Sequence, residues 1–269
     1  MKLNLIKIVL LAIIGIVCHW SLNILLGISN DFLLNIWPLI STILVLITLF
    51  LLRKNITAED SKAIFYLFTV YFVIGHFNIL TEAYVFNVLD LSTTIKELAR
   101  GLIMSLVISF LAVKFLTYES PLTLKGSADR HLLSWMIRIS LVIVLYILFY
   151  ILAGMLVQGT IAEFMDFYQD RVPPLDVILK TQVFRGLIFA LIIIFLSRIF
   201  KASFVKSAII TGLAFSILGA LAPLITPNEH MPQSIRVIHS FEVGITNFFF
   251  GVLAYLILGI KEVHKTVKK

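Results

Sequence analysis

Long apolar runs recur from one end of this chain to the other, and they constrain its fold more than any other feature. A representative run is LISTILVLITLFLL at Leu39–Leu52. About 20 predominantly apolar residues are needed for a helix to cross the hydrocarbon of a bilayer. The runs lack the period-two alternation of outer-membrane strands. The sequence therefore predicts an all-α polytopic membrane bundle, with residues 1–269 forming a single transmembrane domain and no soluble domain.

Composition supports a membrane protein and excludes several other classes. Hydrophobic residues make up 60% of the chain and charged residues only 14%, whereas a soluble domain carries about a quarter charged residues. The net charge of +7 is spread over short loops without a basic, aromatic-interleaved surface, which argues against nucleic acid as a partner. Cys18 is the single cysteine, so an intrachain disulfide and a zinc–thiolate cluster are excluded.

Eight apolar segments are long enough to span a membrane. Their expected bounds are Ile6–Leu26, Phe32–Leu52, Ala63–Phe86, Ile95–Phe115, Leu133–Val157, Val177–Phe200, Phe204–Ile225 and Val237–Ile260. Between the fifth and sixth spans, Phe164, Met165, Phe167 and Tyr168 are expected to form a short helix at the membrane interface. No internal repeat of the kind that many transporters carry is evident in the sequence.

The basic residues predict an orientation. With both termini in the cytoplasm, the inner loops contain most of the 22 lysines and arginines, among them Arg53, Lys54 and Lys201. This asymmetry follows the positive-inside rule. The chain is accordingly expected to be a multi-pass protein of the bacterial cytoplasmic membrane, with the lipid bilayer as its surroundings.

Polar residues gather in the outer halves of several spans. The stretch MPQSIRVIHSFEVGITN places an arginine, a histidine, a glutamate and an asparagine at the start of the last span, and four other spans add polar groups at the same depth. A charge at the centre of a membrane helix costs on the order of 2.5–3.5 kcal/mol. We therefore expect a polar cavity open to the extracytoplasmic side, lined by Asn78, Glu82, Arg100, Gln182, Arg185, Arg236, His239, Glu242 and Asn247.

These residue types suggest two kinds of chemistry. Arginine binds carboxylate or phosphate through two bonds, so Arg100, Arg185 and Arg236, with Gln182, Asn78 and Asn247, are candidate ligand-binding residues for an anionic, lipid-linked or peptide ligand. A glutamate beside a histidine in low dielectric suits general acid–base work, so Glu82, His239 and Glu242 are the candidate catalytic residues. Arg185 has no acid within reach on its own helix and is expected to pair with Glu82 or Glu242.

A metal or haem is weakly indicated, and the cofactor stays unknown. His239 and Glu242 have the i,i+3 spacing that can ligate one ion, but no HExxH motif is present. His19, His76 and His239 all lie in the outer halves of spans, where two facing histidines could bind haem. As structural alternatives, the charged side chains would extend to the lipid headgroups or form salt bridges between helices.

Part of the chain resembles a known family. KTQVFRG at Lys180–Gly186 has the form of a first motif EExxxRG, AFSILGA around Phe215 has the form of a second motif FxxxH, and NFFFGVLAYLILG at Asn247–Gly259 looks like the helix that follows. Together, residues 180–259 resemble the bacterial CAAX-protease-like intramembrane peptidases. Lys180, Thr181 and Gly219 stand where that family has its two glutamates and its histidine. The resemblance thus implies a related membrane fold without peptidase activity.

These patterns leave several functions open. The favoured hypothesis is a polar intramembrane site that binds a small, lipidic or peptide ligand. A membrane-embedded acid–base or metal-dependent enzyme is one alternative, and a transporter or assembly factor without catalysis is another.

Overall fold

The computed structural model describes residues 5–28, 35–56, 58–116, 131–158, 162–228 and 230–260. Within these ranges the chain is helical, apart from its turns and an isolated antiparallel bridge between Ile56 and Phe200. The helical elements are α1 (Leu5–Leu26), α2 (Trp37–Lys54), α3 (Asp60–Phe72), the π-helical turn η1 (Val73–Phe77), α4 (Asn78–Val85), α5 (Leu91–Phe115), α6 (Leu132–Gln158), α7 (Ala162–Tyr168), α8 (Leu175–Ile199), α9 (Phe204–Ser216), the π-helical turn η2 (Ile217–Leu221), α10 (Ala222–Ile225) and α11 (Gln233–Leu258).

The predicted all-helical membrane architecture is confirmed at this level. In the described part of the chain, eight helical segments are long and apolar enough to cross a membrane. Two of them, Asp60–Val85 and Phe204–Ile225, each contain one of the π-helical turns. Several spans start earlier than expected, because polar first turns such as Gln233–Arg236 are helical although they are not apolar. The expected start of the second span, Phe32–Leu34, lies outside the described residues.

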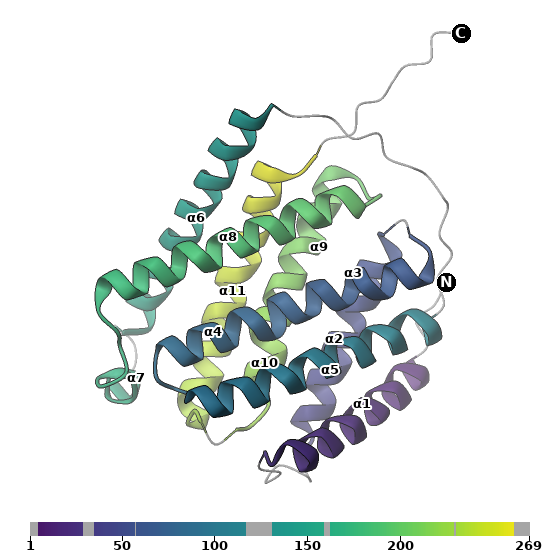
Figure 1. Cartoon of the computed structure of the whole chain (residues 1–269), viewed down its shortest axis with the longest axis horizontal. Helices are drawn as coiled ribbons and strands as arrows, with labels where there is room; N and C mark the ends of the chain where they lie inside the picture. The colour runs from purple at the N-terminus through teal and green to yellow at the C-terminus, as the bar shows by residue number, and fades with distance from the viewer. Residues whose placement is uncertain are drawn as a thin grey trace.

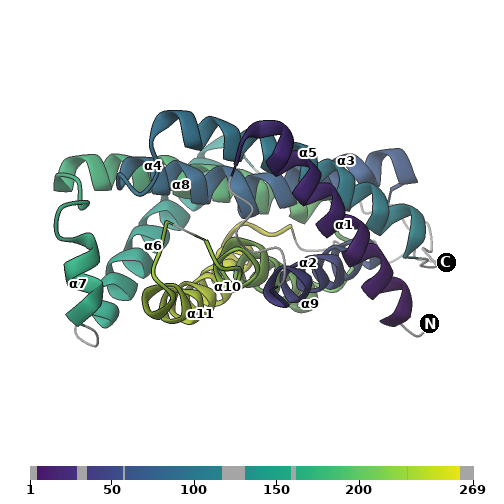
Figure 2. The same ribbon diagram turned by 90° about the horizontal axis from the view of Figure 1, so that it is seen from below.

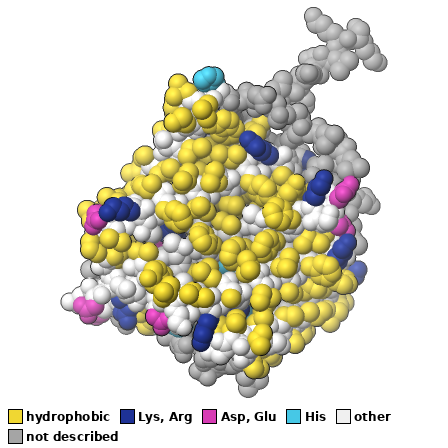
Figure 3. Space-filling view, viewed as in Figure 1, with side chains coloured by type: hydrophobic (Ala, Val, Ile, Leu, Met, Phe, Trp, Pro, Cys, Tyr) yellow, Lys and Arg dark blue, Asp and Glu magenta, His cyan; other side chains and the backbone are white. Residues whose placement is uncertain are grey.

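The spans form two layers (Figures 1 and 2). Helices α8, α3–α4, α5 and α1 lie in one layer, and α6, α11, α9–α10 and α2 lie in the other. The short helix α7 stands beside the start of α8. Apolar side chains cover the face formed by the first layer (Figure 3). Apolar residues of its helices, such as Leu106 of α5 and Leu191 of α8, are about half exposed. An exposed apolar face of this extent is what a lipid-facing surface requires.

Helices α9 and α11 approach each other at a pair of glycines. A Cβ atom added at Gly251 would lie 2.9 Å from the Cα of Gly212. A Cβ added at Gly212 would lie 2.7 Å from the carbonyl oxygen of Phe248. Small residues allow such backbone contact between membrane helices, where packing rather than the hydrophobic effect holds the helices together.

Basic residues meet at the end of the bundle that the sequence places in the cytoplasm. Arg53 and Lys114 both bond Asp60, at 3.2 and 3.0 Å. The backbone N–H of Lys201 donates to the carbonyl of Asn55 at 2.9 Å. Burial lowers the pKa of Lys201, and the neighbouring charges of Arg53 and Lys206 lower it further. The basic residues at 117–130 and beyond 260 lie outside the described residues.

The orientation of this end is a testable prediction. The charge asymmetry places both termini in the cytoplasm. Reporter fusions after Lys269 and after Gln169, which follows α7, should therefore report opposite sides of the membrane. Alkaline phosphatase and green fluorescent protein would serve as the complementary reporters. The same side for both fusions would contradict eight alternating spans.

Candidate functional site

Arg185 of α8 is a buried charge near the end of the bundle opposite Arg53. Its Nη1 lies 2.8 Å from Oε1 of Glu82 on α4, and the two side chains are 7% and 30% exposed. The same nitrogen donates to Oε1 of Gln182, one turn earlier on α8, at 2.9 Å. The guanidinium also lies over the ring of Tyr146, 5.6 Å from its centroid. The predicted pairing of Arg185 with Glu82 or Glu242 is confirmed, and Glu82 is the partner.

A second polar pair lies on α11. Nδ1 of His239 is 2.8 Å from Oε2 of Glu242, and these side chains are 23% and 11% exposed. The His239 ring also contacts α7, with centroid distances of 5.9 Å to Phe164 and 6.5 Å to Tyr168. A carboxylate on Nδ1 fixes the ring's orientation and leaves Nε2 for another partner.

Tyr168 of α7 connects the two pairs electrostatically. Burial raises the pKa of its phenol, the Glu82 and Glu242 carboxylates raise it further, and Arg171 opposes them. Both carboxylates therefore lie within electrostatic reach of the same hydroxyl. We call Glu82, Arg185, Tyr168, His239 and Glu242 the Tyr168 cluster; its members come from α4, α7, α8 and α11.

Helix α7 covers one side of this cluster. The predicted short helix is present at Ala162–Tyr168. Its Phe164 packs against Ile235 at the start of α11, and Phe167, Tyr168 and Met231 surround this contact. These residues form an apolar group separate from the main core. The aromatic side chains of α7 that the sequence assigned to the membrane interface therefore contact α11.

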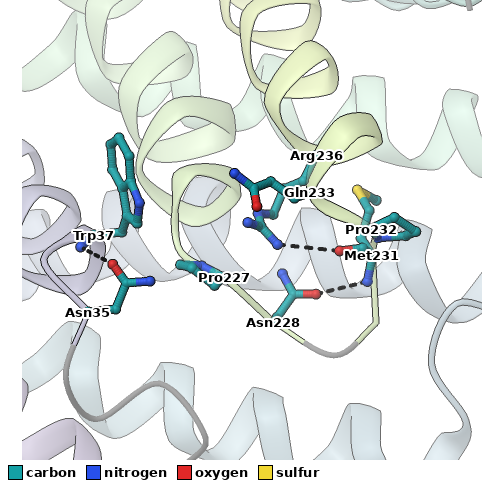
Figure 4. A pocket seen from close by; sticks show the side chains of 8 residues that line it. All are labelled: Asn35, Trp37, Pro227, Asn228, Met231, Pro232, Gln233 and Arg236. Carbon is teal, nitrogen blue, oxygen red and sulfur yellow. Dashed lines mark hydrogen bonds between the residues drawn. The ribbon is translucent and has the colours of Figure 1, made fainter.

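The three arginines expected around one cavity occupy three different places. Arg100 donates to Asn23 of α1 at 2.9 Å and pairs with Glu97 on its own helix. Arg185 belongs to the Tyr168 cluster. Arg236 lines a pocket between the starts of α2 and α11 (Figure 4). Because the polar faces of α5, α8 and α11 are turned toward different neighbours, the single ring of arginines expected from depth alone does not form.

Asn78 and Asn247 donate hydrogen bonds to carbonyl groups of the two π-helical turns. The Asn78 amide donates to the carbonyl of Val73 within η1 at 3.2 Å, and the Asn78 side chain is fully buried. The Asn247 amide donates from α11 to the carbonyl of Gly219 in η2 at 3.5 Å. A π-helical turn disturbs the regular backbone hydrogen bonds, so these amides have a structural use that the sequence did not suggest.

The histidines do not assemble a metal centre with other ligands in the described ranges. No group of three or more His, Cys, Asp and Glu side chains there is placed to hold a metal ion. The His239–Glu242 pair supplies two ligands at most. His76 packs against Tyr71, with ring centroids 5.1 Å apart, and its ring lies over Gly101. The haem hypothesis gains no support from these contacts.

A signal in the sequence was missed. ELARGLIMSLVISFL at Glu97–Leu111 and QVFRGLIFALIIIFL at Gln182–Leu196 share RGLI and four later apolar residues. In both helices the arginine bonds the residue three positions earlier and a polar side chain of a neighbouring helix. The following glycine lies against a ring in both, His76 over Gly101 and Tyr146 over Gly186. Helices α5 and α8 therefore repeat one local design, a smaller unit than the repeated halves of many transporters.

No protein-family model, curated protein or solved structure matches this chain. The repeat also bears on the resemblance to CAAX-protease-like peptidases, since the RG ending of its first motif occurs in α5 as well as in α8. The geometry of the Tyr168 cluster is therefore the basis for inferring its chemistry.

Proposed function

We propose that this protein is a multi-pass protein of the bacterial cytoplasmic membrane that binds a small, lipid-linked or peptide ligand at the Tyr168 cluster, from the extracytoplasmic side. The observation that carries the proposal is that two partly buried polar pairs, Glu82–Arg185 and His239–Glu242, lie on elements that Tyr168 contacts: its ring meets the His239 ring and that of Phe86, one turn after Glu82. Ionisable side chains within a membrane are energetically costly, so their presence there indicates a functional site.

The exposed parts of the cluster indicate what a ligand would offer. Arg185 is nearly buried, whereas Glu82 and His239 keep 30% and 23% of their side-chain surfaces exposed. Glu82 would present a carboxylate oxygen, and His239 would present Nε2. These groups favour a ligand with N–H or O–H donors, such as a peptide or an amino- or hydroxyl-bearing lipid headgroup. The expected anionic part of the ligand would need a cation outside this cluster.

Peptidase activity of the CAAX-protease-like kind is not part of this proposal. Lys180, Thr181 and Gly219 occupy the positions of the family's two glutamates and histidine. Lys180 bonds Asp176 at the exposed start of α8, at 2.8 Å. Gly219 lies in η2, packed against Ile74 of η1. None of these three residues has the carboxylate or imidazole that the family's metal chemistry needs.

An acid–base enzyme is the second candidate, favoured by the His239–Glu242 contact of 2.8 Å. A carboxylate that orients a histidine through Nδ1 is the arrangement used by general bases. The two candidates differ in the effect of Glu242→Gln. An enzyme would lose turnover while retaining ligand binding, whereas a binding protein has no turnover to lose.

The binding proposal predicts stabilisation by a defined ligand class. Purified protein in detergent would be heated with dipeptides, ethanolamine-bearing lysolipids or polyprenyl glycosides. A ligand present at 100 times its Kd stabilises by about 2.7 kcal/mol, which raises Tm by roughly 5–10 °C for a chain of this size. We expect at least one class to do so, and expect the shift to disappear in Glu82→Gln/His239→Gln.

Lys180→Gln is the matched control, because Lys180 is exposed on the same helix as Arg185 and outside the cluster. This variant should respond to the ligand as the wild type does. Equal shifts in wild type, control and cluster variant would show that the ligand binds elsewhere. If none of the three classes shifts Tm, the proposal that the ligand binds through N–H or O–H donors is contradicted.

A further inference from the structure

Arg236 is a buried cation that lacks an acidic partner in the described chain. Arg236 is 5% exposed, and its Nε has no hydrogen-bond partner. Its Nη1 donates to the carbonyl of Met231 at 3.3 Å. No carboxylate of a described residue lies within 4.0 Å of it. Since a guanidinium cannot shed its proton in a protein, its charge needs compensation from another source.

Arg236 lines a pocket of about 430 Å³ (Figure 4). The pocket lies between the residues before α2 and the turn before α11. Its polar side chains are Asn35, Asn228, Gln233 and Arg236, and Trp37 closes one side. The eight lining residues include no acid. A pocket that contains a buried cation and several amides is suited to an anion.

Two asparagines are fixed so that their amide donors are available to this space. Oδ1 of Asn35 accepts the backbone N–H of Trp37 at 3.1 Å. Oδ1 of Asn228 accepts the backbone N–H groups of His230 and Met231, both at 3.0 Å. A backbone N–H can only donate, so in each asparagine the oxygen is used and the NH₂ group is left. Figure 4 shows the Asn228 NH₂ group directed toward the guanidinium of Arg236.

The first turn of α11 adds to this donor set. The helix runs for 26 residues from Gln233, after Pro232, and the first N–H groups of a helix have no acceptor within it. Together with the helix dipole they favour an anion at this end. The buried, unpaired guanidinium is the independent observation that makes the helix start part of a binding site.

We propose that this pocket binds a phosphate group, carried by a membrane lipid headgroup or free in solution. Phosphate offers several acceptor oxygens in different directions, which matches donors arriving from Arg236, Asn228 and Asn35. A carboxylate offers two oxygens in one plane and would leave some of these donors unused. None of the residues that line the pocket belongs to the Tyr168 cluster, and the proposal does not rest on the function proposed for that cluster.

The test measures binding of two phosphate sources by the full chain in a neutral detergent. The probes are inorganic phosphate and dihexanoyl phosphatidic acid, with dihexanoyl glycerol as the phosphate-free control, and isothermal titration calorimetry gives Kd. We expect saturable binding of a phosphate probe that weakens as ionic strength rises. Arg236→Gln should weaken it by about 10-fold or more, since hydrogen bonds to a charged group are worth about 1.5–3 kcal/mol.

Two further variants keep the test decisive. Asn228→Asp retains Arg236 and its surroundings but places a negative charge beside the anion, so it should also weaken binding, whereas Lys180→Gln should leave Kd unchanged. Binding of both probes would indicate a site for phosphate itself, and binding of the lipid alone a headgroup site; either supports the proposal. Absence of saturable binding, equal binding of the phosphate-free control, or unchanged Kd in Arg236→Gln and Asn228→Asp would overturn it.

Discussion

Replacing Arg185 by leucine is expected to destabilise the protein by roughly 3–5 kcal/mol, because it leaves the Glu82 carboxylate without its partner. Arg185 and Glu82 lie 2.8 Å apart, and the Arg185 side chain is 7% exposed. The double variant Arg185→Leu/Glu82→Leu removes both charges and should recover much of the lost stability, since apolar residues often replace a buried ion pair without loss. The measurement is a double-mutant cycle, with the unfolding free energy of detergent-solubilised protein read for each variant.

A surface ion pair on the same helix provides the control for this cycle. Asp176 and Lys180 lie 2.8 Å apart at the start of α8, with side chains 64% and 78% exposed. Exposed pairs contribute about 0–1 kcal/mol, so Lys180→Leu should change stability little. If Arg185→Leu is as mild as Lys180→Leu, then Arg185 is a solvated residue and the Tyr168 cluster is not a buried site.

Enlarging Gly212 should produce the second large effect. A Cβ at this position would lie 2.7 Å from the backbone oxygen of Phe248 and 2.6 Å from Cγ2 of Val252. The backbone contact cannot be relieved by a rotamer change, so α9 and α11 would have to separate. Gly212→Val should therefore cost about 3 kcal/mol, at the upper end of the range for overpacking. Gly251→Val should behave similarly, because its Cβ would lie 2.9 Å from the Cα of Gly212.

Gly154 on α6 is the matched control for these variants. A Cβ added there meets nothing within 4 Å among described atoms. Gly154→Ala should therefore be neutral or stabilising by up to about 1 kcal/mol through helix propensity. Melting temperatures of the three variants in one detergent compare them directly. A Gly212→Val variant as stable as Gly154→Ala would show that α9 and α11 do not pack through these glycines.

The sequence was sufficient to predict the membrane class, the number of apolar spans and the pairing of Arg185 with an acid of another helix, either Glu82 or Glu242. Hydrophobic length determines the spans directly. The pair followed from a charge-balance argument, since Arg185 is ionised and α8 offers it no acid within a turn. An unpaired charge within a membrane helix costs several kcal/mol, so the fold has to bring a partner to it.

Depth alone could not predict which polar residues share a site. Arg100, Arg185 and Arg236 all lie in the first halves of their helices but bond Asn23, Glu82 and the Met231 carbonyl, respectively. Which face of a helix meets which neighbour depends on packing between elements distant in sequence. Asn78 and Glu82 are i,i+4 neighbours in α4, as expected, yet their side chains have different partners: the Asn78 amide reaches back to the π-helical turn η1, and Glu82 bonds Arg185 of α8. Nothing in the composition of VIGHF or ILGAL indicates such a turn.

Cysteine accessibility tests most directly whether the Tyr168 cluster faces the extracytoplasmic water. In a Cys18→Ala background, His239→Cys and Tyr168→Cys would be exposed in intact spheroplasts to a maleimide that cannot cross the membrane. Ser203→Cys, in the exposed turn between α8 and α9 at the opposite end, is the control. We expect the His239 and Tyr168 variants to be labelled without permeabilisation and the Ser203 variant only after it. Labelling of the His239 and Tyr168 variants only after permeabilisation, or not at all, would contradict an outward-facing site.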